Sequence, residues 1–267
     1  MSNPAVTYER EMVPSLFGPW VKDLLDAARL RAPERTLDLA CGTGIVARGV
    51  AAQVGSATEV SGIDLNPAMI EVARSESARA GLQIDWREGR AEALPYGDRS
   101  FDLVLCQQGL QFFSDKAAAL VEAHRVLDSN GRFVVSVWRG LDRHPFFATM
   151  NAVIERRFGM APLAAPFALG DAEELRALLS AAGFVDIDIQ ARSKSAHFPD
   201  PNGFVRMEVD VIAAAVPSVQ HMDEAERAEL AAGIGSEMDG PIRASTQAGH
   251  LVVPMFAHIA SARRGTR

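Results

Sequence analysis

The stretch Thr36-Leu37-Asp38-Leu39-Ala40-Cys41-Gly42-Thr43-Gly44 decides the fold of this chain. Its apolar first half is typical of a buried strand, and its glycines predict a tight turn. The residues that follow, 45–53, have the pattern of a helix. A strand, a glycine turn and a helix start together form a corner that binds nucleotides, because the N–H groups of the helix point at the ligand.

Two cofactors are compatible with this corner. The run from Gly42 to Ala47 fits the dinucleotide fingerprint in the variant that ends in alanine, and Asp64 lies about 20 residues after Gly44, where a ribose-binding acid is expected. An ionised Asp38 would repel the pyrophosphate of NAD. S-adenosylmethionine has no phosphate, and its cationic head suits a nearby acid. Asp38 therefore favours S-adenosylmethionine, although it could instead cap the turn through backbone N–H groups.

The composition predicts one α/β domain with an insertion. Of the 267 residues, 48% are hydrophobic, which is enough for a sizeable core. The net charge of −7 argues against nucleic-acid binding, which needs clustered Lys and Arg. Two cysteines, Cys41 and Cys106, are too few for a disulfide scaffold and fit a reducing cytoplasm. With neither a signal peptide nor an apolar run of ~20 residues that could span a membrane, we expect a cytoplasmic protein.

Strands and helices alternate after residue 33. We expect strands at residues 36–39, 59–63, 83–88, 101–106 and 131–138. We expect helices at residues 45–53, 67–80 and 117–127, and a single helical turn at 91–94. This alternation predicts an α/β fold, a mostly parallel Rossmann-like sheet with helices on both faces.

We expect two further segments around this core, one at the N-terminus and one between the last two strands. Residues 1–32 are expected to form an N-terminal helical segment over the site, with a helix at 12–30 and a loosely attached start at 1–9. The core itself should comprise residues 33–198 and 249–267. Residues 199–248 are too many for a plain connection between the last two strands, so we expect them to form a helical lid.

Four motifs in order identify a family by resemblance. The corner resembles the first motif of class I S-adenosylmethionine-dependent methyltransferases, and Gly62-Ile63-Asp64-Leu65-Asn66-Pro67 resembles the second. Ala91-Glu92-Ala93-Leu94-Pro95-Tyr96 and Ser100-Phe101-Asp102-Leu103-Val104 resemble the third and fourth. Each motif alone is weak, but four at these spacings are specific. Over residues 33–140 the pattern is similar to the small-molecule methyltransferases of ubiquinone and menaquinone biosynthesis, the type 11 group.

This resemblance implies a seven-stranded sheet with an antiparallel last strand, S-adenosyl-L-methionine as the cofactor and a small-molecule acceptor. It also implies which residues bind the cofactor: Asp38, Ala40, Gly42, Gly44, Asp64, Leu65, Met69, Ala91, Glu92 and Gln107. One departure from the family is Arg90, which stands where relatives carry an Asp that contacts adenine. Glu92 or a backbone carbonyl could replace that contact.

The acceptor is encoded less clearly. The fourth strand ends in Cys106-Gln107-Gln108-Gly109, without the Asn-Pro-Pro-Tyr or Asp-Pro-Pro-Tyr signature of enzymes that methylate nucleobases or glutamine side chains. We expect a small apolar or aromatic acceptor, because apolar and aromatic residues are frequent in the lid. Candidate acceptor-binding residues are Tyr8, Trp20, Gln108, Gln111 and Arg206.

A general base would help if the acceptor must lose a proton. His144 and His197 are the candidates, and for each a surface or capping role is the alternative. No His, Cys and Asp set has metal-ligand spacing, so we expect no metal. Two other functions stay open, an NAD-dependent oxidoreductase and a non-catalytic cofactor-binding protein. The sequence has no Tyr-x-x-x-Lys pair of the kind that short-chain dehydrogenases use, which disfavours the first of them. The sequence leaves open whether the protein is a monomer or a homodimer.

Overall fold

The structure, a computed structural model, describes residues 3–55, 58–213 and 216–266. The remaining residues of the expected segments, 1–2, 56–57, 214–215 and 267, lie outside this description. The chain divides into two compact units. The sheet unit comprises Met1–Trp138, Leu169–Arg192 and Ala257–Arg267, and the helical unit comprises Arg139–Ala168 and Ser193–Phe256.

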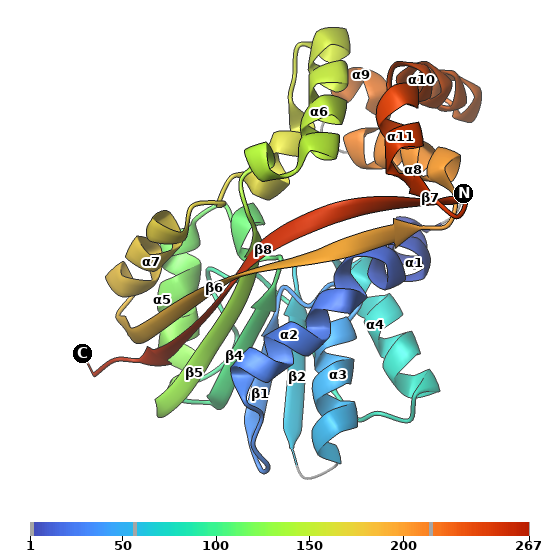
Figure 1. Cartoon of the computed structure of the whole chain (residues 1–267). Helices are drawn as coiled ribbons and strands as arrows, with labels where there is room; N and C mark the ends of the chain where they lie inside the picture. Colours follow the sequence, from blue (N-terminus) through green and yellow to red (C-terminus); the bar gives the residue numbers. More distant parts are fainter. Residues whose placement is uncertain (1–2, 56–57, 214–215, 267) are drawn as a thin grey trace. The chain divides into compact units, whose positions relative to one another are not determined.

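The sheet has the strand order β3-β2-β1-β4-β5-β8-β6 (Figure 1). The pairs β1–β2, β1–β4, β2–β3 and β4–β5 are parallel, and β8 is antiparallel to β5. The strands on this path are β1 Arg35–Leu39, β2 Glu59–Asp64, β3 Asp85–Glu88, β4 Phe101–Gln107, β5 Leu127–Trp138, β6 Phe184–Phe198 and β8 His250–Arg264. This confirms the Rossmann-like α/β fold and its antiparallel strand.

The predicted number of seven strands is wrong by one. The eighth, β7, is the two-residue strand Thr246–Gln247, which pairs with Leu251 and His250 at the start of β8. A positive φ at Ala248 and at Gly249 turns the chain between the two strands. So short a strand has no alternation of apolar and polar residues from which it could be predicted.

Helices cover both faces of the sheet (Figure 1). On one face, α2 (Gly18–Ala28), α3 (Ile45–Val54) and α4 (Pro67–Arg79) bury apolar residues against Leu103, Leu105 and Val134. On the other face, α5 (Lys116–Val126) and α7 (Ala172–Ala181) bury theirs against Val104, Cys106 and related strand residues. Successive residues of β4 thus point to opposite helix layers, as the pleat of a strand requires. The predicted helices of this core lie within a few residues of the observed ones.

The N-terminal segment is helical from its first described turn. It consists of α1 (Pro4–Thr7), the π-helix η1 (Tyr8–Phe17) and α2 (Gly18–Ala28). The expectation of a loose start at residues 1–9 is therefore wrong for residues 4–9. The Asn3 side chain caps α1, and Ala5 is buried. A π-helix of this length is rare, and π-helical turns are frequent at functional sites.

The predicted helical turn at residues 91–94 is also wrong. Arg90 and Ala93 form an isolated antiparallel bridge around a tight turn. The Leu94 N–H group donates instead to Glu122 of α5 at 2.8 Å. This contact between distant parts of the chain, rather than local helix propensity, determines the conformation of the segment.

Asp102 of the fourth motif has a structural role. Its carboxylate accepts hydrogen bonds from the backbone N–H of Arg35 at 2.8 Å and from the guanidinium of the same residue at 2.8 and 3.1 Å. The guanidinium lowers the pKa of Asp102, and the backbone bond adds to this. The pair fixes the start of β1 beside the start of β4.

The helical unit is built on an aromatic cluster. The rings of Phe146, Phe147, Phe167, Phe198 and Phe204 contact one another with centroids 4.6–6.1 Å apart. Arg156 and Arg157 both bind Glu237. The helices of the unit are η4 Leu141–Arg143, α6 Pro145–Phe158, η5 Pro162–Phe167, α8 Pro201–Ala213, α9 Pro217–Gln220, α10 Glu224–Glu237 and α11 Asp239–Ser245. The segment expected to form the lid, 199–248, lies in this unit together with α6.

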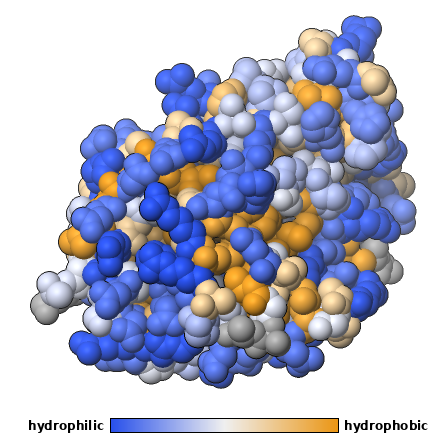
Figure 2. Space-filling view, turned by 60° about the horizontal axis from the view of Figure 1, so that its bottom comes forward, coloured by the Kyte–Doolittle hydropathy of each residue, from blue (hydrophilic) through white to orange (hydrophobic). Residues whose placement is uncertain are grey.

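Figure 2 shows one face of the molecule, on which hydrophilic residues cover most of the surface and hydrophobic residues gather in patches. Among the described residues, two of the most exposed large hydrophobic side chains are Leu65, after β2, and Phe112, after β4. Both follow the carboxyl end of a parallel strand, which is where ligands bind in open α/β sheets.

Gly62 of β2 is a sensitive point of this fold. A Cβ atom there would overlap the ring of Trp86 and come within 3.2 Å of the Cys41 sulfur. We expect Gly62→Ala to lower the free energy of unfolding by about 1–3 kcal/mol, the usual cost of overpacking a core. Urea unfolding measures the change.

Gly235→Ala in α10 is the control, because a Cβ there meets no atom within 4 Å. It should leave the stability unchanged or raise it by roughly 0.5–1 kcal/mol. Equal stabilities of Gly62→Ala and the wild type would contradict the packing described for Trp86.

Candidate active site

The candidate site begins at the corner between β1 and α3. Three residues of the corner have a positive φ: Ala40 (56°), Gly42 (54°) and Gly44 (85°). Glycine adopts this left-handed conformation without strain, whereas an alanine in the same conformation costs about 1 kcal/mol of conformational free energy. Ala40 is therefore a strained position, and strain of this kind is concentrated at functional sites.

Asp38 of β1 is buried next to the corner. One of its carboxylate oxygens accepts a hydrogen bond from the Ala47 N–H group at 2.9 Å, so Asp38 fixes the first turn of α3. Its side chain is 1% exposed. Burial raises the pKa of Asp38 to about 7, against the opposing effect of the Ala47 bond. With a pKa of about 7, Asp38 favours the cationic head of S-adenosylmethionine less strongly than a fully ionised acid would.

Asp64, at the end of β2, joins the second motif to the first. One carboxylate oxygen accepts from the Gly42 N–H group at 2.8 Å, and the other accepts from the Asn66 N–H group at 2.9 Å. Burial raises the pKa of this acid, and the backbone bonds oppose the rise. Each carboxylate oxygen has two lone pairs, so Asp64 retains the capacity to accept hydrogen bonds from a ribose.

The structure explains why position 44 is a glycine, which the sequence alone does not. A Cβ at Gly44 would overlap the indole of Trp86, whose ring fills the space beside both Gly44 and Gly62. The indole N–H group donates to Ser77 of α4 at 3.0 Å. Gly44 thus permits close packing of the helix on the sheet, in addition to any approach of a ligand. Trp86 belongs to no motif, and the sequence analysis missed it.

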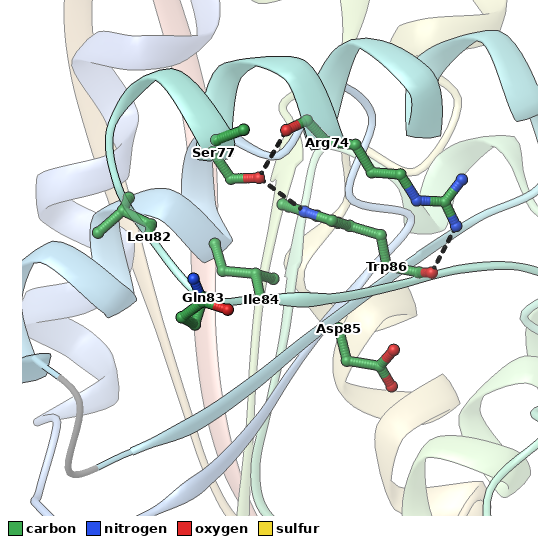
Figure 3. A pocket seen from close by; sticks show the side chains of 8 residues that line it. Arg74, Ser77, Leu82, Gln83, Ile84, Asp85 and Trp86 are labelled. Carbon is green, nitrogen blue, oxygen red and sulfur yellow. Dashed lines mark hydrogen bonds between the residues drawn. The ribbon is translucent and has the colours of Figure 1, made fainter.

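A pocket lies on the outer side of α4 and β3 (Figure 3). In Figure 3, Ser77 joins Arg74 and the indole of Trp86, and the Arg74 guanidinium donates to the Trp86 carbonyl at 2.9 Å. None of the residues that line this pocket was predicted for the site. The bonds of Arg74 and Ser77 are explained by the anchoring of β3 to α4.

The turn after β3 contacts the turn after β4. The Glu92 carboxylate accepts from the Ser114 hydroxyl at 2.8 Å and lies 3.7 Å from the Arg90 guanidinium. Ala91 is buried, and Arg90 is exposed. Glu92 therefore organises this edge of the sheet, and a contact to adenine would use lone pairs that Ser114 leaves free. Leu65 is 58% exposed beside Asp64, and Met69 is half-buried on the first turn of α4.

Three glutamines, Gln107, Gln108 and Gln111, lie at or just after the end of β4. The Gln107 amide donates to the Phe17 carbonyl of η1 at 3.0 Å, which leaves its Oε1 atom buried and without a partner among the described residues. The Gln111 amide donates to Gln108 Oε1 at 3.3 Å. The Ser136 hydroxyl, beside Gln107 on β5, also has no partner within the described part of the chain. The sequence analysis missed Ser136.

The N-terminal segment reaches the glycine corner. Tyr8 stands over Gly42, since a Cβ there would lie 3.8 Å from the ring and the hydroxyl of Tyr8. Burial and, secondarily, the nearby Asp64 raise the pKa of the Tyr8 phenol. The next residue, Glu9, binds Arg48 of α3 at 2.6 Å, and the two side chains are only 18% and 12% exposed. This ion pair, which the sequence did not indicate, holds Tyr8 at the corner.

Trp20 lies deeper in the sheet unit than predicted for an acceptor-binding residue. It is 1% exposed and packs edge-on against Trp138, with centroids 5.4 Å apart. Phe17 stacks on Tyr8 at 5.2 Å and contacts Trp138 at 6.3 Å. An aromatic row thus runs from the glycine corner to the end of β5.

The other predicted residues belong to the helical unit. His144 is fully buried, with Nδ1 3.1 Å from the Gly140 carbonyl and Nε2 accepting from the Phe256 N–H group at 3.0 Å. Burial lowers its pKa. To act as a base, His144 would have to break one of these bonds. His197 is exposed on β6, and Arg206 is exposed on α8, where it binds Asp200 at 3.2 Å.

A buried acid in the helical unit was missed. Glu208 of α8 is 5% exposed, and burial raises its pKa to about 7. It lies one helical turn after Phe204 of the aromatic cluster. Glu208 interrupts the apolar face of the helix, and this break in the pattern could have identified it from sequence.

Three further observations concern the described residues as a whole. Cys41 and Cys106 are free, buried thiols. Within residues 3–55, 58–213 and 216–266, no group of three His, Cys, Asp or Glu side chains could hold a metal ion. None of the helices described has the length and apolarity needed to cross a bilayer.

The corner lies in a region of the chain that matches a known family. Residues 37–135, from β1 to β5, match the sequence profile of a family described as a methyltransferase domain. This part of the chain is similar to a methyltransferase domain. The demethylmenaquinone methyltransferase of Thermus thermophilus is 40% identical to this chain over 116 residues, which are 43% of this chain and 52% of the relative. The residues matched by the family profile include the glycines of the corner and Asp64.

Two further proteins extend the comparison. The ubiquinone/menaquinone biosynthesis C-methyltransferase of Haemophilus ducreyi is 31% identical over 162 residues, 60% of this chain and 61% of that relative. The chain therefore spans about half the length of the curated relatives it matches, and somewhat more of this one. The solved YcgJ protein of Bacillus subtilis has a TM-score of 0.62 at 21% identity, covering 94% of this chain and all of its own. That likeness shows a shared fold.

The buried Asp38 predicts how the stability of the protein depends on pH. Its folded-state pKa of about 7 lies above the unfolded value of ~3.9, so the folded protein binds the proton more tightly. This contribution to stability is complete below pH ~4 and is lost as the pH rises through 7. Asp38→Asn cannot ionise, so its stability relative to the wild type should increase between pH 4 and pH 8 by roughly 4 kcal/mol.

Urea unfolding at several pH values measures this difference. Gln83→Ala, at an exposed position just before β3, is the control: it neither adds nor removes an ionisable group, so its effect should not depend on pH. An Asp38→Asn difference that does not change with pH would show that Asp38 ionises normally in the folded protein.

Proposed function

We propose that this protein transfers a methyl group from S-adenosylmethionine to a small apolar or aromatic acceptor. The observation that supports this most directly is the bond from the Gly42 N–H group to Asp64, which joins the first two methyltransferase motifs into one cofactor corner. The family match over residues 37–135 and the methyltransferase relatives support the same function.

The residues at the corner fit the chemistry of this cofactor. Asp64 has lone pairs for the ribose hydroxyls, and the exposed Leu65 and half-buried Met69 offer apolar surface for adenine. The unpartnered Oε1 atom of Gln107 and the carbonyl of Ala40 would accept hydrogen bonds from the ammonium group. The remaining contacts proposed for the cofactor are those of Gly42, Gly44, Ala91 and Glu92.

When bound, the cofactor supplies an electrophilic methyl group on a sulfonium. In the overall reaction the carbon–sulfur bond breaks, a bond from the methyl carbon to the acceptor forms, and the acceptor loses a proton to a base or to water. The protein contributes alignment and exclusion of water. The aromatic row of Tyr8, Phe17 and Trp138 would supply apolar surface at this edge of the sheet.

The assignment of a base follows from the two histidines. His197 is exposed and stays a candidate, whereas both nitrogens of His144 are occupied. We propose a positioning role for His144, which fixes the backbone of Gly140 and Phe256. Arg206 is a candidate for contact with a polar acceptor group only if it leaves Asp200.

The relatives indicate the class of the acceptor. Two of them are named for menaquinone or ubiquinone biosynthesis, and the Haemophilus protein is named a C-methyltransferase. A quinone precursor or a compound of similar shape is thus a reasonable first acceptor to test. The relatives give no support to the alternative of an NAD-dependent oxidoreductase. The free thiols and the net charge of −7 support a reducing compartment such as the cytoplasm and no nucleic-acid partner.

Asp64→Ala tests the proposed cofactor site. We expect the variant to bind S-adenosylmethionine more weakly by about 1–3 kcal/mol, the range for a lost hydrogen bond to a charged group. Calorimetric titration measures the affinity. Glu59→Ala, at the exposed start of the same strand, is the control and should bind as the wild type does.

An unchanged affinity in Asp64→Ala would show that Asp64 does not hold the ribose. Transfer of a radiolabelled methyl group to a panel of phenols, quinols, polyketides and lipids then tests the activity. A protein that binds the cofactor tightly and methylates none of them would favour the non-catalytic alternative.

A further inference from the structure

The turn after β4 contains two buried amides that are not fully paired. Gln108 is 4% exposed and Gln111 is 5% exposed. The single bond between them leaves Gln108 Nε2 and Gln111 Oε1 without a partner among the described residues. A buried polar group without a partner costs about 1–3 kcal/mol, so folded proteins rarely keep two in one place without a function.

The orientation of the amides does not change this conclusion. Exchanging the nitrogen and oxygen of both side chains reverses the bond between them, and one NH₂ group and one carbonyl oxygen are again left over. Exchanging only one would place two like atoms together. The pair therefore offers a ligand one hydrogen-bond donor and one acceptor in either orientation.

The backbone of the turn supports a functional role. Gln108 has a φ of 54°, a conformation that costs a residue with a side chain about 1–2 kcal/mol. The next residue, Gly109, lies against the cofactor corner, since a Cβ there would come within 2.8 Å of the Ala40 Cβ. Strain and unpaired amides thus coincide directly beside Ala40.

The turn that carries the pair packs, through Leu110, on the side of the sheet away from the corner helix. Leu110, between the two glutamines, belongs to the apolar cluster of α5 and α7. Gln107 instead binds Phe17 of η1, the segment that runs into α2, and α2 and α3 cover the opposite face. A cofactor at the start of α3 would therefore be nearer to Gln107, which leaves Gln108 and Gln111 for the second substrate.

From these observations we infer that Gln108 and Gln111 bind a hydroxyl group of an uncharged methyl acceptor. The inference rests on the proposed function. A hydroxyl group donates one hydrogen bond and accepts another, which matches the two free amide atoms. A carboxylate only accepts and an ammonium only donates, so each would leave one amide atom unpaired in a buried site. Glutamine does not take up the acceptor's proton, so the pair positions the acceptor and is not a base.

The main test is the double variant Gln108→Met/Gln111→Met. Replacing both amides by apolar groups of similar shape leaves no new unpaired atom, so the variant should fold with near wild-type stability. It should bind S-adenosylhomocysteine with unchanged affinity, because the pair does not contact the cofactor. Gln53→Met, at an exposed position on α3, is the control.

The acceptor class is measured with matched compounds. Sets of benzene, naphthalene and linear alkyl skeletons each carry a hydroxyl, a carboxylate or an amine, and radiolabelled methyl transfer gives kcat/KM for each. We expect the wild type and Gln53→Met to prefer the hydroxyl member by about ten-fold or more, as expected for a buried hydrogen-bonding site. The double variant should lose this preference, mainly through KM.

Gln111→Glu is a second variant that keeps the shape and can only accept hydrogen bonds when ionised. It should shift the preference from the hydroxyl member towards the amine. This variant keeps the test decisive if the double variant does not fold.

Three results would overturn the inference: a wild-type preference for a charged member, an unchanged preference in the variants, or a loss of S-adenosylhomocysteine affinity in the double variant. If the wild type binds the cofactor but methylates nothing, the proposed function fails. Calorimetric binding of the same sets to protein loaded with S-adenosylhomocysteine then decides the inference, because only a hydroxyl preference that depends on the pair supports it.

Discussion

The hydrogen bond from the Gly42 N–H group to the Asp64 carboxylate is the contact on which the candidate site depends. It joins the exits of two parallel strands, and the buried Asp38 fixes the helix start through the Ala47 N–H group in the same way. The left-handed residues of the corner are tolerated because these two acids hold the backbone on both sides. The corner is thus formed by the protein alone, and a cofactor would enter a backbone that is already shaped.

Much of this arrangement could be predicted from the sequence, because it is local. The strand, the glycines and Asp64 lie within 29 residues, and strand-to-helix alternation specifies the parallel order around them. The role of Gly44 against Trp86 could not be predicted, since the two residues meet only through the packing of α4 on the sheet. For the same reason the Glu9–Arg48 ion pair and the Leu94–Glu122 bond have no signal in the sequence.

In the helical unit, the sequence predicts the helices but not the surroundings of the candidate bases. The length of the segment 199–248 predicts a helical lid, but nothing in the sequence reveals the hydrogen-bond partners of His144 and His197. His144 is buried between Gly140 and Phe256, whereas His197 is exposed. The sequence likewise does not show that Asp38 is buried. Burial raises its pKa to about 7, so the acid acts first as a structural hydrogen-bond acceptor and only partly as a charge.

The choice of cofactor is the central claim, because the glycine corner is compatible with more than one nucleotide. Calorimetric titration of the wild-type protein with S-adenosylhomocysteine and, separately, with NAD tests it most directly. The corner described here predicts saturable, one-site binding of S-adenosylhomocysteine and no measurable heat with NAD over the same concentrations. Binding of NAD without binding of S-adenosylhomocysteine would contradict the account.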